Sequence, residues 1–115
     1  MNTLFICSQN KLRSPTAENV FSDYPGINVL SAGTNKDAEV PLTDELVSWA
    51  DTIFVMEGTH RNKLRIKFKE QIKNQKIICL NIPDEFEYMA PELVEILEHK
   101  CTNYLANAKK IPLQC

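Results

Sequence analysis

The chain has 115 residues, of which 43% are apolar and 24% are charged. This length and composition suit one compact domain over residues 1–115 and leave no room for two. The formal net charge of -2 points neither toward nor away from a nucleic-acid partner. No apolar run approaches the length of about 18 residues that spans a membrane, and no signal segment is visible. We therefore expect a cytoplasmic protein without a membrane partner.

The cysteines are Cys7, Cys79, Cys101 and Cys115, and no two of them form a C-x2-C pair. This spacing predicts no zinc site, and we expect no metal in the protein. Without a secretory signal the cysteines are expected to be thiols rather than disulfides. A single cysteine in an unusual setting is then a candidate nucleophile, and Cys7 has that setting.

The first half of the chain alternates strand and helix patterns. Asn2–Cys7 is a short apolar run typical of a strand. Pro15–Phe21 is predicted as a helix, because proline is accepted in a first helical turn. Ile27–Leu30 predicts a second strand, and a loop over 32–41 follows it. Leu42–Ala50 has apolar residues on one side and is predicted as a short helix.

The second half continues the alternation. Thr52–Met56 and Ile77–Leu80 are continuous apolar runs, which suit strands that are buried on both faces of a parallel sheet. Between them, residues 63–69 alternate as a strand would, yet apolar residues also recur every fourth position. We predict a helix there, because a crossover is needed between two buried parallel strands. Pro91–Ala108 is predicted as an amphipathic helix.

This order predicts the α/β class, with a central four-stranded parallel sheet between two layers of helices. In such sheets the active site lies outside the carboxyl ends of the strands. Cys7 ends the first strand, and a phosphate-binding loop is expected between that strand and the first helix. Consecutive backbone N–H groups of such a loop form an anion cradle, which also favours the thiolate form of a cysteine. Arg13 offers a planar two-pronged donor to phosphate oxygens, and Ser14 can donate to the sulfur. The predicted phosphate-binding residues are Ser8, Gln9, Asn10, Lys11, Leu12, Arg13 and Ser14.

The C-x5-R-S-P pattern between a strand and a helix resembles the signature of low-molecular-weight protein tyrosine phosphatases, over Phe5–Glu18. Ser31–Thr34 resembles the second signature of that family, and 50–56 resembles its third strand. The resemblance implies a phosphatase with Cys7 as nucleophile and no cofactor. It also implies that Asn10 braces the loop and that Ser31 bonds to it.

The family uses an aspartate after the fourth strand as general acid, and the resemblance gives that role to Asp84. Glu85 stands where the family usually has proline and is a rival for the role. Phe86 and Tyr88 are candidates for the pocket rim. The implied mechanism has two steps: Cys7 attacks phosphorus while Asp84 protonates the leaving group, and water then hydrolyses the phosphocysteine.

Several alternatives stay open at the level of the sequence. The segment 35–48 is short and lacks the aromatic residues with which the family holds phosphotyrosine. A more open pocket would admit nucleotide, sugar or nucleic-acid phosphates. A phosphate-binding or phosphotyrosine-binding module without turnover is a second alternative. Arsenate reductase is a third, although it needs further cysteines near the nucleophile. Inorganic phosphate and vanadate are expected ligands in each phosphatase interpretation.

Charge is unevenly placed along the chain. Seven of the 13 basic residues lie in 61–76, and six acidic residues lie in 84–98. Solvated helix faces explain this pattern, and recruitment of an acidic or nucleic-acid substrate is the alternative. His60 is predicted to be a solvated residue at the start of a helix rather than a catalytic base.

Overall fold

The computed structural model describes residues 1–113, with side chains described as far as residue 105. The chain alternates four strands with four helices, as the sequence pattern predicts. The strands are β1 (Asn2–Cys7), β2 (Asn28–Gly33), β3 (Thr52–Val55) and β4 (Lys76–Cys79). The helices are α1 (Arg13–Phe21), α2 (Asp44–Trp49), α3 (Gly58–Lys67) and α4 (Pro91–Leu113). Cys115 and its expected thiol lie outside the described residues.

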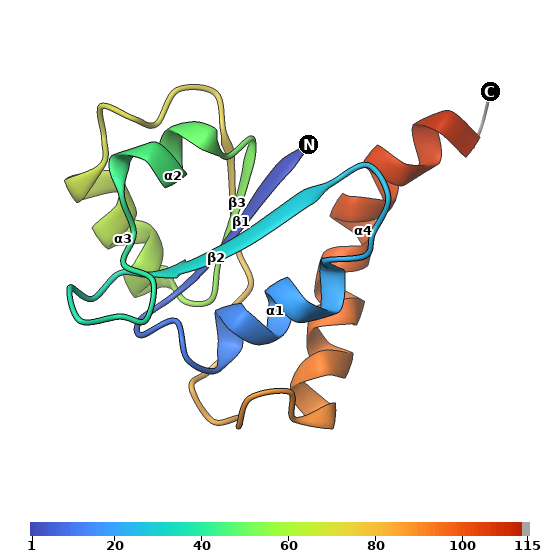
Figure 1. Ribbon diagram of the computed structural model, residues 1–115, viewed down its shortest axis with the longest axis horizontal. Helices are drawn as coiled ribbons and strands as arrows, with labels where there is room; N and C mark the ends of the chain where they lie inside the picture. Colours follow the sequence, from blue (N-terminus) through green and yellow to red (C-terminus); the bar gives the residue numbers. More distant parts are fainter. Residues whose placement is uncertain (114–115) are drawn as a thin grey trace.

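The four strands form one parallel sheet in the order β2-β1-β3-β4. Helices α1 and α4 cover one face of this sheet, and α2 and α3 cover the other (Figure 1). The fold is therefore the predicted three-layer α/β/α arrangement. Because β1 and β3 are central and covered on both faces, almost all of their side chains are buried, whereas β2 and β4 lie at the edges.

Alternate side chains of the central strands face the two helix layers. Phe5 packs with the α1 and α4 side, where its ring stacks on those of Phe21 and Phe54. Leu4 and Ile6 pack with the α2 and α3 side. This two-residue period divides the core into two apolar clusters, one on each face of the sheet.

The segment between β3 and β4 is helical, as predicted, and α3 begins five residues before the stretch that carried the ambiguous pattern. Leu64 and Phe68 are both buried, whereas Ile66 is 81% exposed. The four-residue spacing therefore describes the buried face, and the alternation of apolar residues is incidental. Helix α4 also continues beyond the predicted end at 108, to Leu113.

Candidate active site

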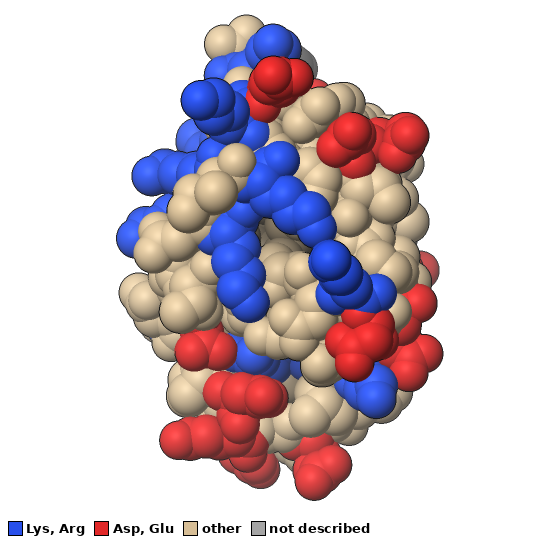
Figure 2. All heavy atoms as spheres, turned by 90° about the vertical axis from the view of Figure 1, so that its left-hand side faces the viewer, with Lys and Arg blue, Asp and Glu red and all other residues tan. Residues whose placement is uncertain are grey.

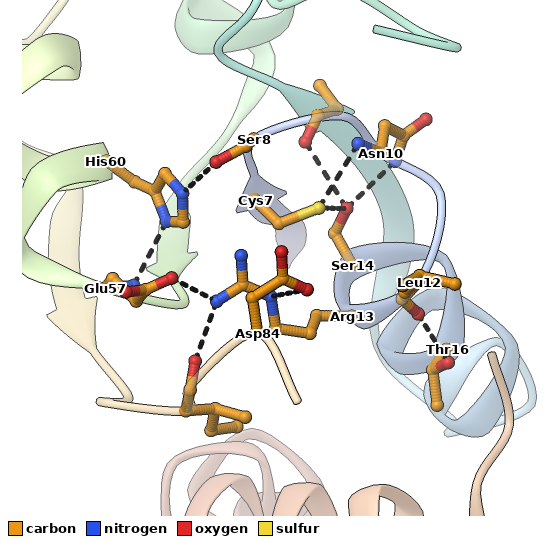
Figure 3. A network of polar contacts seen from close by, with 12 residues as sticks. Cys7, Ser8, Asn10, Leu12, Arg13, Ser14, Thr16, Glu57, His60 and Asp84 are labelled. Atoms are coloured by element: carbon orange, nitrogen blue, oxygen red, sulfur yellow. Dashed lines mark hydrogen bonds and ion pairs between the residues drawn. The ribbon is translucent and has the colours of Figure 1, made fainter. Parts of the chain in front are cut away.

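The sulfur of Cys7 lies at the carboxyl end of β1, only 3% of the residue being exposed. The backbone N–H of Asn10 donates to Sγ at 3.2 Å, and the Ser14 hydroxyl lies 2.9 Å from Sγ (Figure 3). Asn10 Nδ2 donates to Ser14 Oγ at 2.9 Å. Because Ser14 Oγ is the acceptor in that hydrogen bond, its own hydroxyl proton is free to donate to another atom. Sγ is the nearer acceptor, because the Ala32 carbonyl oxygen is 3.4 Å away. Two hydrogen-bond donors, Asn10 N–H and the Ser14 hydroxyl, thus point at the sulfur.

A buried network of side chains braces the loop after β1. Asn10 adopts a left-handed conformation with φ of 58°, which asparagine tolerates better than most residues. Its amide also donates to Ser31 Oγ at 2.9 Å, and Ser31 donates to Glu18 Oε1 at 2.5 Å. The network joins the loop to β2 and α1, the role that the resemblance assigned to Asn10 and Ser31. Glu18, whose part in it was not predicted, stands one turn after Ser14 on α1.

Gly33 lets β2 pass close behind the loop. A Cβ atom at this position would lie 2.5 Å from the Ser8 carbonyl oxygen and 2.6 Å from the Cβ of Ala38. A Cβ atom essentially never lies that close to another heavy atom, so only glycine fits here without a shift of its neighbours. The second of the two sequence signatures therefore supports the loop by leaving space as well as by supplying Ser31.

The guanidinium of Arg13 lies beneath the loop and is held from two other elements. Its Nη1 donates to Glu57 Oε1 at 2.5 Å and to the Ile82 carbonyl oxygen at 2.8 Å, and its Nε lies 3.7 Å from Asp84 Oδ1. Its side chain is 3% exposed, so these partners compensate a buried charge. Glu57 was missed by the sequence analysis. Its place two residues after β3, at the same edge of the sheet as Cys7, is the signal that identifies it.

Asp84 lies at the mouth of a hollow of about 170 Å³ that reaches down to Cys7. Its side chain is 62% exposed, so the carboxyl group is accessible to water. The described residues that line the hollow include no aromatic side chain and are Cys7, Ser8, Gln9, Lys11, Leu12, Arg13 and Asp84. Glu85, the rival for the acid role, is exposed and is not among them.

The two aromatic candidates for the pocket rim differ in placement. Phe86 is half-buried and packs against the core beneath α1 and α4. Tyr88 is 49% exposed and lies beside a neighbouring depression that Lys11 and Ser31 also line. Neither borders the hollow at Cys7 itself, and of the two only Tyr88 is exposed near it.

His60 is buried rather than solvated, with 1% of its surface exposed, so the prediction for this residue was wrong. Its ring turns inward because Nδ1 accepts the backbone N–H of Glu57 at 3.1 Å, closing a capping box at the start of α3. Nε2 lies 2.8 Å from Ser8 Oγ in the phosphate loop. Burial and the nearby charge of Arg13 lower the pKa of His60 to about 4, so the ring is neutral at physiological pH.

The other described cysteines lie away from this site. Cys101 is fully buried on α4, and burial raises the pKa of its thiol to about 12. Cys79 ends β4, where its thiol donates to Asn81 Oδ1 at 3.3 Å. Within residues 1–105 no group of three or more His, Cys, Asp or Glu side chains is arranged to hold a metal ion. No helix among the described residues has the length and apolar character of a membrane span.

Charged side chains are unevenly spread over the face that carries the carboxyl ends of the strands. Figure 2 shows most lysine and arginine side chains over its upper left and centre, and acidic side chains over its lower part and at its upper right. Along the sequence, basic residues concentrate in 61–76 and acidic ones in 84–98.

Comparison with solved structures identifies the fold as that of low-molecular-weight protein tyrosine phosphatases. The tyrosine phosphatase Wzb from Escherichia coli K30 matches with a TM-score of 0.74 and 20% identity, over 92% of this chain and 96% of that one. SP-PTP, a low-molecular-weight protein tyrosine phosphatase from Streptococcus pyogenes, gives 0.74 and 17%, over 92% and 91%. The YwlE arginine phosphatase from Geobacillus stearothermophilus gives 0.70 and 21%, over 98% and 94%. No protein-family model and no curated protein matches the sequence.

Proposed function

We propose that this protein is a cysteine-dependent phosphatase that hydrolyses phosphate monoesters through a phosphocysteine, in the manner of protein tyrosine phosphatases. The observation that carries the proposal is the environment of Cys7. Its sulfur accepts hydrogen bonds from Asn10 N–H and Ser14, at the floor of a hollow that Arg13 also borders. Donors gathered around one buried sulfur favour a thiolate nucleophile and an anionic ligand above it.

The reaction divides between two groups on opposite sides of the substrate. The Cys7 thiolate attacks phosphorus, so that an S–P bond forms and the ester P–O bond breaks, while Asp84 gives its proton to the leaving oxygen. Water then attacks the phosphocysteine and passes a proton to Asp84. Inorganic phosphate leaves, and the thiolate is restored. Arg13 and the loop amides stabilise the phosphoryl oxygens in both steps.

Phosphotyrosine is the leading substrate, since tyrosine phosphatases are among the proteins that share the fold. Phosphoarginine, which is not an ester and whose P–N bond would break with the proton of Asp84 going to the leaving nitrogen, is a second candidate. It is favoured because no described residue lining the hollow is aromatic and because an arginine phosphatase is also similar in structure. Phosphotyrosine and phosphoarginine in the same peptide sequence separate the two by their kcat/KM values. We further propose that the enzyme works in the cytoplasm, where its nucleophilic thiol stays reduced.

Hydrolysis of para-nitrophenyl phosphate, in the presence of a chelator and fresh reductant, tests the activity. We expect turnover by the wild type and a loss on the order of a thousandfold or more in Cys7→Ser, because the nucleophile is removed. Vanadate should still bind that variant, since the cradle remains. Cys79→Ser serves as the matched control, and its rate should equal that of the wild type.

Two outcomes contradict the proposal. Turnover retained in Cys7→Ser would remove Cys7 as nucleophile. A wild type that binds vanadate but turns over no aryl phosphate, phosphotyrosine or phosphoarginine would favour a phosphate-recognition module instead.

A further inference from the structure

His60 and Ser8 form a contact that the two-step mechanism leaves unused. Ser8 directly follows the nucleophile, and His60 lies on α3, 52 residues further along the chain. Their side chains meet at 2.8 Å beside the hollow (Figure 3). The effect of this contact on the phosphate loop depends on whether His60 Nε2 or Ser8 Oγ is the hydrogen-bond donor.

The proton positions follow from the partner on the other side of the ring. The backbone N–H of Glu57 points at Nδ1 from 3.1 Å, so Nδ1 must be the unprotonated nitrogen. In a neutral imidazole the proton then lies on Nε2. Nε2–H is therefore the donor to Ser8, and Ser8 Oγ is the acceptor.

The neutral form holds over the physiological range. Burial comes first among the causes that lower the pKa of His60 to about 4, followed by the positive charge of Arg13. Lys63 lowers the pKa further, whereas the carboxylates of Glu57 and Asp84 raise it. The ring thus stays a fixed donor to Ser8 at the pH values at which phosphatases act in cells.

Because Ser8 Oγ accepts the hydrogen bond from His60, the hydroxyl proton of Ser8 points away from His60. Ser8 is half-buried and borders the hollow together with Cys7 and Arg13. Rotation about the Cβ–Oγ bond of Ser8 can therefore turn this hydroxyl proton toward the hollow. A bound phosphoryl group, with its negative oxygens, is the strongest acceptor that would enter this space.

We propose that His60 is a positioning residue that fixes the Ser8 hydroxyl as a donor to an oxygen of the phosphoryl group bound over Cys7. The inference rests on the proposed phosphatase function and adds a side-chain donor to those of the loop amides and Arg13. A donor oriented before the reaction needs no reorganisation as charge moves onto the phosphoryl oxygens. Its contribution should therefore fall mainly on kcat rather than on KM.

Two substitutions of His60 separate its two hydrogen bonds. In His60→Gln the amide nitrogen can take the place of Nε2 and donate to Ser8, while the bond from Glu57 N–H is lost. In His60→Asn the side-chain oxygen can take the place of Nδ1 and keep that bond, while the side chain is too short to reach Ser8. Ser8→Ala removes the hydroxyl, and Ser8→Thr retains it.

We expect Ser8→Ala to lower kcat for para-nitrophenyl phosphate about tenfold, the size of one lost hydrogen bond to a charged group. His60→Asn should lower kcat by a similar factor, whereas His60→Gln and Ser8→Thr should lie closer to the wild type. The inhibition constant of vanadate should rise in parallel with the loss of kcat. His99→Asn, which changes an exposed histidine on α4, is the control and should match the wild type.

The double variant decides between positioning and mere structural support. If His60 acts through Ser8, His60→Asn should cost almost nothing further once Ser8→Ala is present. Losses that multiply, or equal losses in His60→Asn and His60→Gln, would overturn the inference while leaving the phosphatase function intact. If the wild type lacks turnover, the proposed function fails by itself. Vanadate affinities of Ser8→Ala, His60→Asn and the double variant then test whether His60 acts through Ser8.

Discussion

The two loops that meet at the hollow are built in opposite ways. The loop from Cys7 to Ser14 is held by buried side chains from α1, β2 and α3, and Arg13 within it is almost fully enclosed. The loop over 81–89 is mostly exposed and is anchored near its two ends. There Ile82 N–H donates to the Met56 carbonyl at 2.8 Å, and Met89 N–H donates to Thr16 Oγ1 at 2.9 Å.

This difference matches the two chemical tasks of the proposed reaction. The phosphoryl group has the same shape in every substrate, so a preorganised cradle suits it. The leaving group differs between substrates, and an exposed acid held by a lightly anchored loop can adapt to it. Fewer buried contacts also mean that the 81–89 loop opens at lower free-energy cost than the phosphate loop.

Among the changes that test this comparison of the two loops, the largest effect is expected in the exposed loop, at Asp84. Asp84→Asn should slow phenyl phosphate about a hundredfold, because the poor leaving group needs a proton. A substrate with a very acidic leaving group should be slowed much less. The ratio of the two losses in kcat, measured for both substrates, is the quantity that tests the acid.

Glu85→Gln is the matched control, since it removes a neighbouring carboxylate that lies outside the hollow. Equal slowing of both substrates by Asp84→Asn would remove Asp84 as general acid. A dependence on the leaving group that appears in Glu85→Gln instead would transfer the role to Glu85.

A smaller effect is expected from loosening the buried loop at a distance from the sulfur. Ser31→Ala removes the partner that Asn10 Nδ2 and Glu18 share. The free energy of unfolding should fall by about 1–3 kcal/mol, because polar groups are left unpaired in a buried place. We expect kcat/KM to fall about tenfold with it. Urea denaturation and steady-state rates measure the two losses, and Ser48→Ala, in an exposed part of α2, controls for the substitution itself.

The smallest effect concerns stability and pH. The pKa of His60 is lowered to about 4 in the folded protein from its ordinary 6.5, so the unfolded chain binds a proton that the folded protein does not bind between these values. Above pH 6.5 the titration of His60 therefore costs no free energy of unfolding. As the pH falls from 6.5 toward 4, protonation of the unfolded chain lowers the free energy of unfolding. His60→Asn should therefore lose less free energy of unfolding between pH 7 and pH 5 than the wild type. Denaturant titrations at the two pH values give the comparison, and a His60→Asn variant as acid-sensitive as the wild type would contradict it.

Much of the phosphate loop could be predicted because its parts are close in sequence. Cys7, Asn10 and Ser14 fall within eight residues between a strand and a helix, and the backbone alone brings them together. Glu57 and His60 escaped prediction because their partners are 44 and 52 residues away. A histidine near a helix start looks solvated until a tertiary contact buries it.

The sequence by itself determined the alternation of strands and helices, the parallel sheet and the position of Cys7 at its carboxyl edge. These features follow from hydrophobic periodicity and from the geometry of short connections, which act locally. Only the tertiary structure decided which carboxylate pairs with Arg13, which ring nitrogen of His60 carries the proton and how far Asp84 is exposed. Each depends on how separate elements pack, because burial and the choice of hydrogen-bond partner are properties of the assembled core.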